Sequence, residues 1–266
     1  MSDVAGAIRA LRRRRRRRDM AVRVGAGVVV LLAWEILGRY LDPLIFSPPS
    51  DIARAAVHVV GSGELWKYLS VSLKVFAIGM ALATVAGIVA GIAIARFRLL
   101  DLAAEPWVIA LYSTPMVAVI PLIVVWVGFG DSAKATVIFL FAVFPILLNT
   151  YQGVKSVDPR LLEVARAFRS PERALWRDVI VPSSLPFIVA GLRLALGRAL
   201  VGMIVADLYT AVSGVGYLIV RYAQTMQIDR LFVPVVTLAL LGIVLVQGLR
   251  WLEMKLAPWQ HHVRDE

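Results

Sequence analysis

The sequence predicts an all-α membrane protein, a bundle of six transmembrane helices, and three observations support this prediction. The chain of 266 residues is 59% hydrophobic and only 18% charged, whereas a soluble domain has about 25% charged residues. Its mean hydropathy is +0.77, and it contains several apolar runs close to the roughly 20 residues that cross a bilayer as a helix. The alternating ten-residue patterns of membrane β-strands are absent, so a barrel is disfavoured.

Six segments are apolar enough to be transmembrane helices, and an even number places both termini on one side. They cover residues 22–41, 70–95, 105–128, 132–152, 184–206 and 231–251. Most of the 29 lysines and arginines fall on the side of the termini, which also holds the loops 96–104 and 153–183. By the positive-inside rule, this side is cytoplasmic.

Residues 1–21 form a basic tail before the first span, which covers residues 22–41. Seven of the charges behind the net charge of +11 are the consecutive arginines Arg12–Arg18. Because like charges repel one another, we expect this run to be disordered and to bind anionic lipid on the cytoplasmic side. Binding to nucleic acid or to a protein partner is the less favoured alternative, since the basicity is local. The tail therefore predicts membrane lipid as a partner and no nucleic acid.

The segments that follow differ in how they are interrupted. Residues 42–69 form an extracytoplasmic segment, in which the prolines of 47–50 precede a short helix-like stretch. The third span contains Pro106, Pro115 and Pro121, and such prolines leave backbone carbonyls that protein or cavity water must satisfy. We therefore expect this span to face other protein or a solute pathway. The second span carries small residues at every fourth position, which allow close approach of a neighbouring helix: Gly79, Ala83, Gly87, Gly91 and Ala95.

The cytoplasmic loop at 153–183 carries the clearest pattern outside the spans. Asp158-Pro159 and Ser170-Pro171 are each typical of an N-cap followed by the first residue of a helix, and Pro182 is expected to end the second helix. The first helix has an apolar stripe at helical spacing, formed by Leu161, Leu162, Ala165 and Phe168. From the pattern alone, this pair of helices either folds against its own bundle or docks a separate cytosolic protein.

The stretch EVARAFR at 163–169, followed by VIVP at 179–182, resembles the EAA loop of ATP-binding-cassette (ABC) importer permeases. In that family three residues separate Glu-Ala-Ala from a Gly, and nine residues separate this Gly from Ile-x-Leu-Pro; the spacing here agrees throughout. Further motifs resemble the subfamily that serves nitrate, taurine and aliphatic sulfonates. They are FSP at 46–48, the segment from PL at 121–122 to GFG at 128–130, FPILLNT at 144–150, GLR at 191–193 and SGVGYL at 213–218.

The resemblance implies a six-helix permease of the type I importer kind in the bacterial inner (plasma) membrane, with a core domain over 70–255 and a cytoplasmic tail at 256–266. It also implies four partner chains: two copies of a cytosolic ABC ATPase, which hold ATP and Mg, a second permease copy that completes a homodimer, and an extracytoplasmic solute-binding protein. The residues that would couple to the ATPase are Leu162, Glu163, Ala165, Arg166, Phe168, Arg169 and Pro182.

The sequence departs from the family pattern at three positions. Arg169 stands where the family usually has Gly, so we expect either a right-handed turn or a small strain there. Val164 replaces the Ala at the second position of the Glu-Ala-Ala motif, and Asp207 stands where relatives more often carry Glu.

Ionisable residues inside spans are candidates for the solute pathway, because their burial in lipid is costly. These are Arg193, Arg198 and Asp207. An anionic solute would need a pathway cation, whereas the competing interpretation gives the arginines a structural partner such as Asp207, Glu35 or a backbone carbonyl. We expect Glu35 itself to be structural.

Several other functions are disfavoured. The chain has no cysteine and three scattered histidines, so we expect no metal site and no cofactor on this chain. No phosphate-binding loop is present, which predicts a transport subunit without its own ATPase site. An ion-coupled secondary transporter is the alternative function, but it should show inverted repeats with broken helices at matched positions, and none is visible. An intramembrane enzyme would need a catalytic set in the spans, and none assembles.

Overall fold

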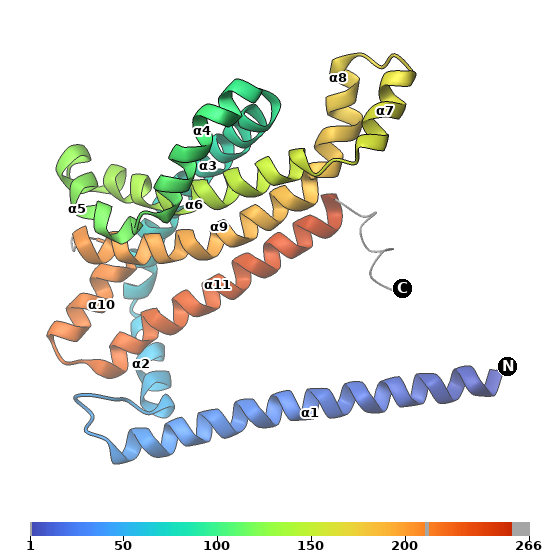
Figure 1. Cartoon of the computed structure of the whole chain (residues 1–266). Coiled ribbons are helices and arrows are strands. Elements are labelled where there is room, and N and C mark those ends of the chain that lie inside the picture. Colours follow the sequence, from blue (N-terminus) through green and yellow to red (C-terminus); the bar gives the residue numbers. More distant parts are fainter. Residues whose placement is uncertain (1, 211–212, 257–266) are drawn as a thin grey trace. The chain divides into compact units, whose positions relative to one another are not determined.

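The computed structural model describes residues 2–210 and 213–256, which are helical with no strand (Figure 1). The helices are α1 Ser2–Tyr40, α2 Pro49–Gly61, α3 Glu64–Arg96, α4 Arg98–Ser113, α5 Met116–Val127, α6 Asp131–Lys155, α7 Pro159–Ala167, α8 Glu172–Leu175, a π-helical turn Trp176–Ile180, α9 Val181–Thr210, α10 Val215–Gln224 and α11 Ile228–Leu256. The prediction of an all-α fold is confirmed.

Within the described residues, five stretches are long and apolar enough to cross a membrane, and a bent helix pair raises the number to six if it counts as one span. The five are Arg18–Tyr40, Glu64–Arg96, Asp131–Lys155, Glu172–Thr210 and Ile228–Trp251. Most of these helices extend past the apolar segment that predicted them, since backbone hydrogen bonding continues through the charged residues at their ends.

The bent pair is where the third predicted span, 105–128, needs correction. The structure divides it into α4 and α5, which meet at an angle of 98°. Thr114, between them, is extended with φ −69° and ψ 131°, because the ring of Pro115 disfavours a helical residue before it. Pro106 and Pro121 lie inside helices and do not break them.

The expected disorder of Arg12–Arg18 is wrong in this structure. The backbone of α1 is one helix from Ser2 to Tyr40 and includes the arginine run. Arginine is a good helix former, and extending an existing helix costs much less than starting a new one. The apolar part of α1 therefore propagates into the charged part.

The chain divides into two compact units, and the first contains residues 2–63 and 222–233. In this unit, the Trp34 ring packs 6.2 Å from Phe46 and 5.7 Å from Phe232, measured between ring centroids. One oxygen of the Glu35 carboxylate accepts the Ser50 backbone N–H at 3.0 Å, and the other accepts the Ser50 hydroxyl at 2.8 Å. Glu35 thus joins α1 to the start of α2, in agreement with the structural interpretation of this residue.

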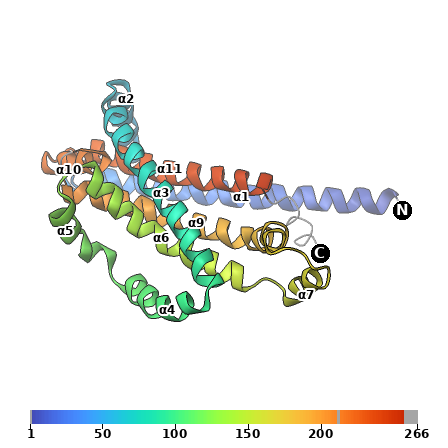
Figure 2. The same cartoon turned by 90° about the horizontal axis from the view of Figure 1, so that it is seen from above.

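The second unit contains residues 64–210, 213–221 and 234–256, and α6 is at its centre. Helix α6 packs against both α3 and α9, and the three lie side by side in Figures 1 and 2. The small residues of α3 face α6: a Cβ added to Gly79 would lie 2.8 Å from Ile138, and one added to Gly91 would lie 2.7 Å from Thr150. The predicted close approach is confirmed. This core holds α6 and α9 in register, and both carry candidate site residues.

Candidate functional site

The loop between α6 and α9 contains two short helices outside the bundle. The Asp158 side chain accepts the Arg160 backbone N–H at 2.9 Å, and Pro159 is the first residue of α7, as predicted. The second start is shifted: Pro171 is the N-cap of α8, which begins at Glu172, and no side chain caps it. Ser170 lies in the turn instead.

The turn between α7 and α8 is built around Arg169. Its φ is +50°, the left-handed conformation that glycine adopts most readily. The Arg169 N–H donates to the Arg166 carbonyl at 2.9 Å, and the Ser170 N–H donates to the Ala165 carbonyl at 3.0 Å. This pair of bonds is the Schellman motif that closes helix C-termini. Of the two expectations for Arg169, the strained one describes the structure.

Pro182 does not end the second helix, contrary to the prediction. Helix α8, the π-turn and α9 form one continuous run over Glu172–Thr210. In the π-turn the Val181 N–H donates to the Trp176 carbonyl, five residues back. The next residue, Pro182, has no N–H to donate, so it follows this wide turn within the helix. The loop is therefore continuous with the membrane helix that leaves it.

The outer face of α7 is apolar and uncovered within the described chain. Leu161 is 48% exposed, Val164 is 55% exposed and Phe168 is 81% exposed. Leu162 and Ala165 are half-buried, whereas Glu163, Arg166 and Arg169 are exposed. A separate groove of about 560 Å³ is lined by residues of α8, the π-turn and the start of α9, namely Glu172, Arg173, Trp176, Arg177 and Val181.

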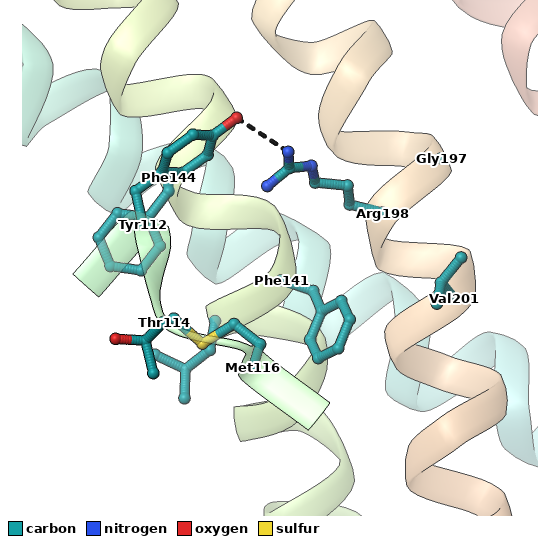
Figure 3. Close-up of a pocket in the computed structure, with 9 residues that line it drawn as sticks. Tyr112, Thr114, Met116, Phe141, Phe144, Gly197, Arg198 and Val201 are labelled. Atoms are coloured by element: carbon teal, nitrogen blue, oxygen red, sulfur yellow. Dashed lines mark hydrogen bonds between the residues drawn. The ribbon is translucent and has the colours of Figure 1, made fainter. Parts of the chain in front are cut away.

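An open pocket of about 300 Å³ lies on the second unit where α4 breaks from α5, and its lining residues Arg198 and Val201 are exposed. The Arg198 guanidinium, from α9, donates to the Tyr112 hydroxyl at 2.8 Å, and its carbon lies 4.8 Å from the centre of that ring. Figure 3 shows the two side chains reaching toward one another from α9 and α4, with Phe141 of α6 nearby. The other lining residues are Thr114, Met116, Leu140, Phe144, Gly197 and Val201.

The structure does not bring Arg193 to this pocket. Arg193 forms an ion pair with Glu253 of α11, and both side chains are partly buried. Its competing interpretation named Asp207, Glu35 or a backbone carbonyl as the partner. Arg193 therefore has a structural partner, as that interpretation expected. The partner is Glu253, however, and neither of the acids that were named.

Asp207 also lies away from the pocket, in a buried ion pair with Lys134. The two side chains are 2% and 1% exposed, and their nearest charged atoms are 2.7 Å apart. Lys134 Nζ also donates to the Ser213 carbonyl at 2.6 Å and to its hydroxyl at 3.0 Å. The second Asp207 oxygen accepts the Ser72 hydroxyl at 2.6 Å. The cluster therefore joins α3, α6, α9 and the segment before α10.

Three partners in these sites were not predicted: Lys134, Tyr112 and Glu253. Lys134 stands at the edge of an apolar segment, where hydropathy alone assigns a lysine to the outer loop. Tyr112 lies in the first half of the predicted proline-rich span 105–128 and carries no charge that would mark it as a site residue. The glycines of SGVGYL at 213–218 allow close approach to Asp207, since a Cβ at Gly214 would lie 2.3 Å from the Asp207 carboxylate, but the motif did not point to Lys134.

A bundle of membrane helices with a charged pocket and a helical loop outside it defines a membrane subunit of a transport system. The chain belongs to the family described as binding-protein-dependent transport system inner membrane component, which matches residues 83–258. The resemblance to ABC importer permeases is confirmed, and the chain is a multi-pass inner-membrane subunit of that class.

Curated relatives cover most of the chain. The putative aliphatic sulfonates transport permease protein SsuC of Bacillus subtilis (strain 168) is 33% identical over 235 residues, covering 88% of this chain and 85% of that protein. The taurine transport system permease protein TauC of Escherichia coli (strain K12) is 28% identical and covers 93% and 92%. The formylaminopyrimidine transport permease protein ThiX of Halalkalibacterium halodurans is 30% identical and covers 88% and 93%.

A solved structure shares the fold. The match is the crystal structure of an amino acid ABC transporter with histidines, with a TM-score of 0.50 and 18% identity. It covers 72% of this chain and 91% of that one. At this identity the likeness concerns the fold alone.

Proposed function

We propose that this chain is the permease subunit of an ATP-driven importer. It receives a small solute from an extracytoplasmic binding protein and passes it into the cytoplasm through a pathway formed with a second permease copy. Two copies of a separate cytosolic ATPase bind ATP and Mg, and they dock on the loop that contains α7 and α8. Both chain termini lie on the cytoplasmic side, as the distribution of lysine and arginine favours.

The exposed face of α7 is the observation that carries this proposal. A Phe168 side chain that is 81% exposed loses the roughly 1.5–3 kcal/mol that burial of such a side chain provides. Glu163 and Arg166 flank this face and are exposed, so they are available for polar contacts. An apolar centre with charged neighbours is typical of a protein interface.

The continuity of α8 with α9 supports a route for coupling. Residues 172–210 form one helical run, so a displacement of the docked loop would move the helix that carries Arg198. Transport requires two arrangements of the bundle, open to opposite sides, whose populations the ATPase shifts.

Purification of the complex from detergent tests the docking. We expect Phe168→Ala and Glu163→Ala to reduce the amount of ATPase that co-purifies with the permease and to lose solute-stimulated ATP hydrolysis. Phe129→Ala is a matched control for the first assay, because Phe129 is also an exposed phenylalanine, at 74%, but lies just before the opposite end of α6. ATPase retention and stimulated hydrolysis at wild-type levels in both loop variants would contradict the proposal.

A further inference from the structure

The charge of Arg198 is unusual for its position. Along α9, Arg198 lies about 25 Å from Val181 at 1.5 Å per residue, within a helix long enough to cross the bilayer. Such a charge faces protein or a water-filled cavity, because its exposure to lipid is costly. Arg198, which is exposed in this chain, is therefore expected to face other protein or a water-filled cavity and not lipid.

Arg198 also differs from the other deep cations of the second unit. Lys134 is paired with Asp207, and Arg193 is paired with Glu253. Within the described part of the chain, Arg198 has a neutral phenol as its hydrogen-bond partner and forms no ion pair. Its positive charge is thus uncompensated, while its geometry is fixed by the hydrogen bond and by the contact with the Tyr112 ring.

The rest of the pocket is mainly apolar. Phe141, Phe144 and Met116 line it together with the guanidinium (Figure 3). Guanidinium groups bind planar and tetrahedral oxyanions through several N–H donors, and aromatic and aliphatic walls bind carbon chains. The two features lie within one volume of about 300 Å³, which accommodates a small organic ion.

We propose that Arg198 and Tyr112 form a subsite for small organic anions, such as a sulfonate with a short carbon chain, on the way through the permease. The guanidinium binds the anionic head, the Tyr112 hydroxyl orients the guanidinium and donates a further hydrogen bond, and the wall of Phe141 and Met116 contacts the carbon chain. This subsite rests on the proposed transport function and specifies its substrate class. The names of the relatives give different solutes, so the assignment of an anionic solute rests on the charge of Arg198 in the pocket and not on similarity to those relatives.

The absence of cysteine from the chain allows a test that needs no transport. Val201 lines the pocket and is 50% exposed, so a Val201→Cys variant places a thiol beside Arg198. In membranes with the full complex, its labelling rate is measured with an anionic sulfonatoethyl and a cationic trimethylammonioethyl methanethiosulfonate. Each rate is divided by that reagent's rate with a free thiol in solution.

We expect the anionic reagent to react faster, and Arg198→Gln in the same background to lower the anion-to-cation ratio about tenfold, which corresponds to about 1.4 kcal/mol. Arg193→Gln is the matched control and should leave the ratio unchanged, because that charge is paired outside the pocket. An unchanged ratio in the Arg198 variant, or a thiol that reacts with neither reagent, would overturn the subsite.

Protection by added anions tests the organic part. Ethanesulfonate should slow labelling more than inorganic sulfate does, because only ethanesulfonate has a carbon chain for the apolar wall. Equal protection by both would overturn the assignment to organic anions. The labelling assay does not depend on the docking assay. ATPase binding by the Phe168 variant tests the proposed function, and the anion preference of the Arg198 variant tests the subsite, so either proposal can be contradicted without the other.

Discussion

The Lys134–Asp207 cluster and the α7–α8 loop lie near opposite ends of α6 and α9, and they treat polar and apolar groups in opposite ways. In the cluster, the three donors of the lysine ammonium are occupied by Asp207 and by two atoms of Ser213. In the loop, Phe168 and Val164 are exposed while charged residues surround them. A charge inside this bundle therefore serves the fold when its partners lie in the chain, whereas the groups left without internal partners are those available to other molecules.

Breaking the cluster should have the largest effect on stability. Lys134→Met leaves the buried Asp207 carboxylate without its cation, and loss of one partner of such a pair costs about 3–5 kcal/mol. We expect a strongly lowered unfolding temperature in detergent and a reduced yield from membranes. The double variant Lys134→Met with Asp207→Leu removes both charges and should recover part of the loss. A single variant as stable as the wild type would show that the pair does not hold the fold together.

Sequence patterns predicted the parts of this comparison that depend on neighbours along the chain. The Asp158 cap and the small-residue face of α3 follow from spacing within one helix, and both are confirmed. The Lys134–Asp207 pair joins residues on two helices, α6 and α9, and no local pattern encodes which distant acid faces a given lysine. The prediction that Pro182 ends the second helix was wrong because the π-turn before it changes the hydrogen-bond register, and a proline then fits within the helix.

Relief of the strain at Arg169 should have a smaller effect on stability, and in the opposite direction to Lys134→Met. With φ at +50°, Arg169→Gly relieves a left-handed conformation that costs a side-chain-bearing residue roughly 1–2 kcal/mol, offset by the greater freedom of glycine in the unfolded chain. We expect the loop to become slightly more resistant to amide hydrogen exchange, by a few-fold at Phe168 and Ser170. The global unfolding temperature should change little, because the turn lies outside the bundle. Faster exchange at these amides would show that arginine does not strain the turn.

Phe168→Ala should have the smallest effect on stability, although its proposed effect on coupling to the ATPase is large. Phe168→Ala removes a side chain that is 81% exposed, so unfolding should stay within about 0.5 kcal/mol of the wild type, as for surface substitutions in general. Phe76→Ala makes the same chemical change at a position that is 5% exposed in the core of α3, α6 and α9, where it should cost about 3–5 kcal/mol. Thermal unfolding of the two variants in one detergent compares them directly.

If Phe168→Ala destabilised the permease as much as Phe76→Ala does, the α7 face would be part of the fold, and its exposure could no longer support a docking role. If only Phe76→Ala destabilises it, a loss of ATPase binding in the Phe168 variant is attributable to the interface itself, because the permease that fails to bind is as stable as the one that binds.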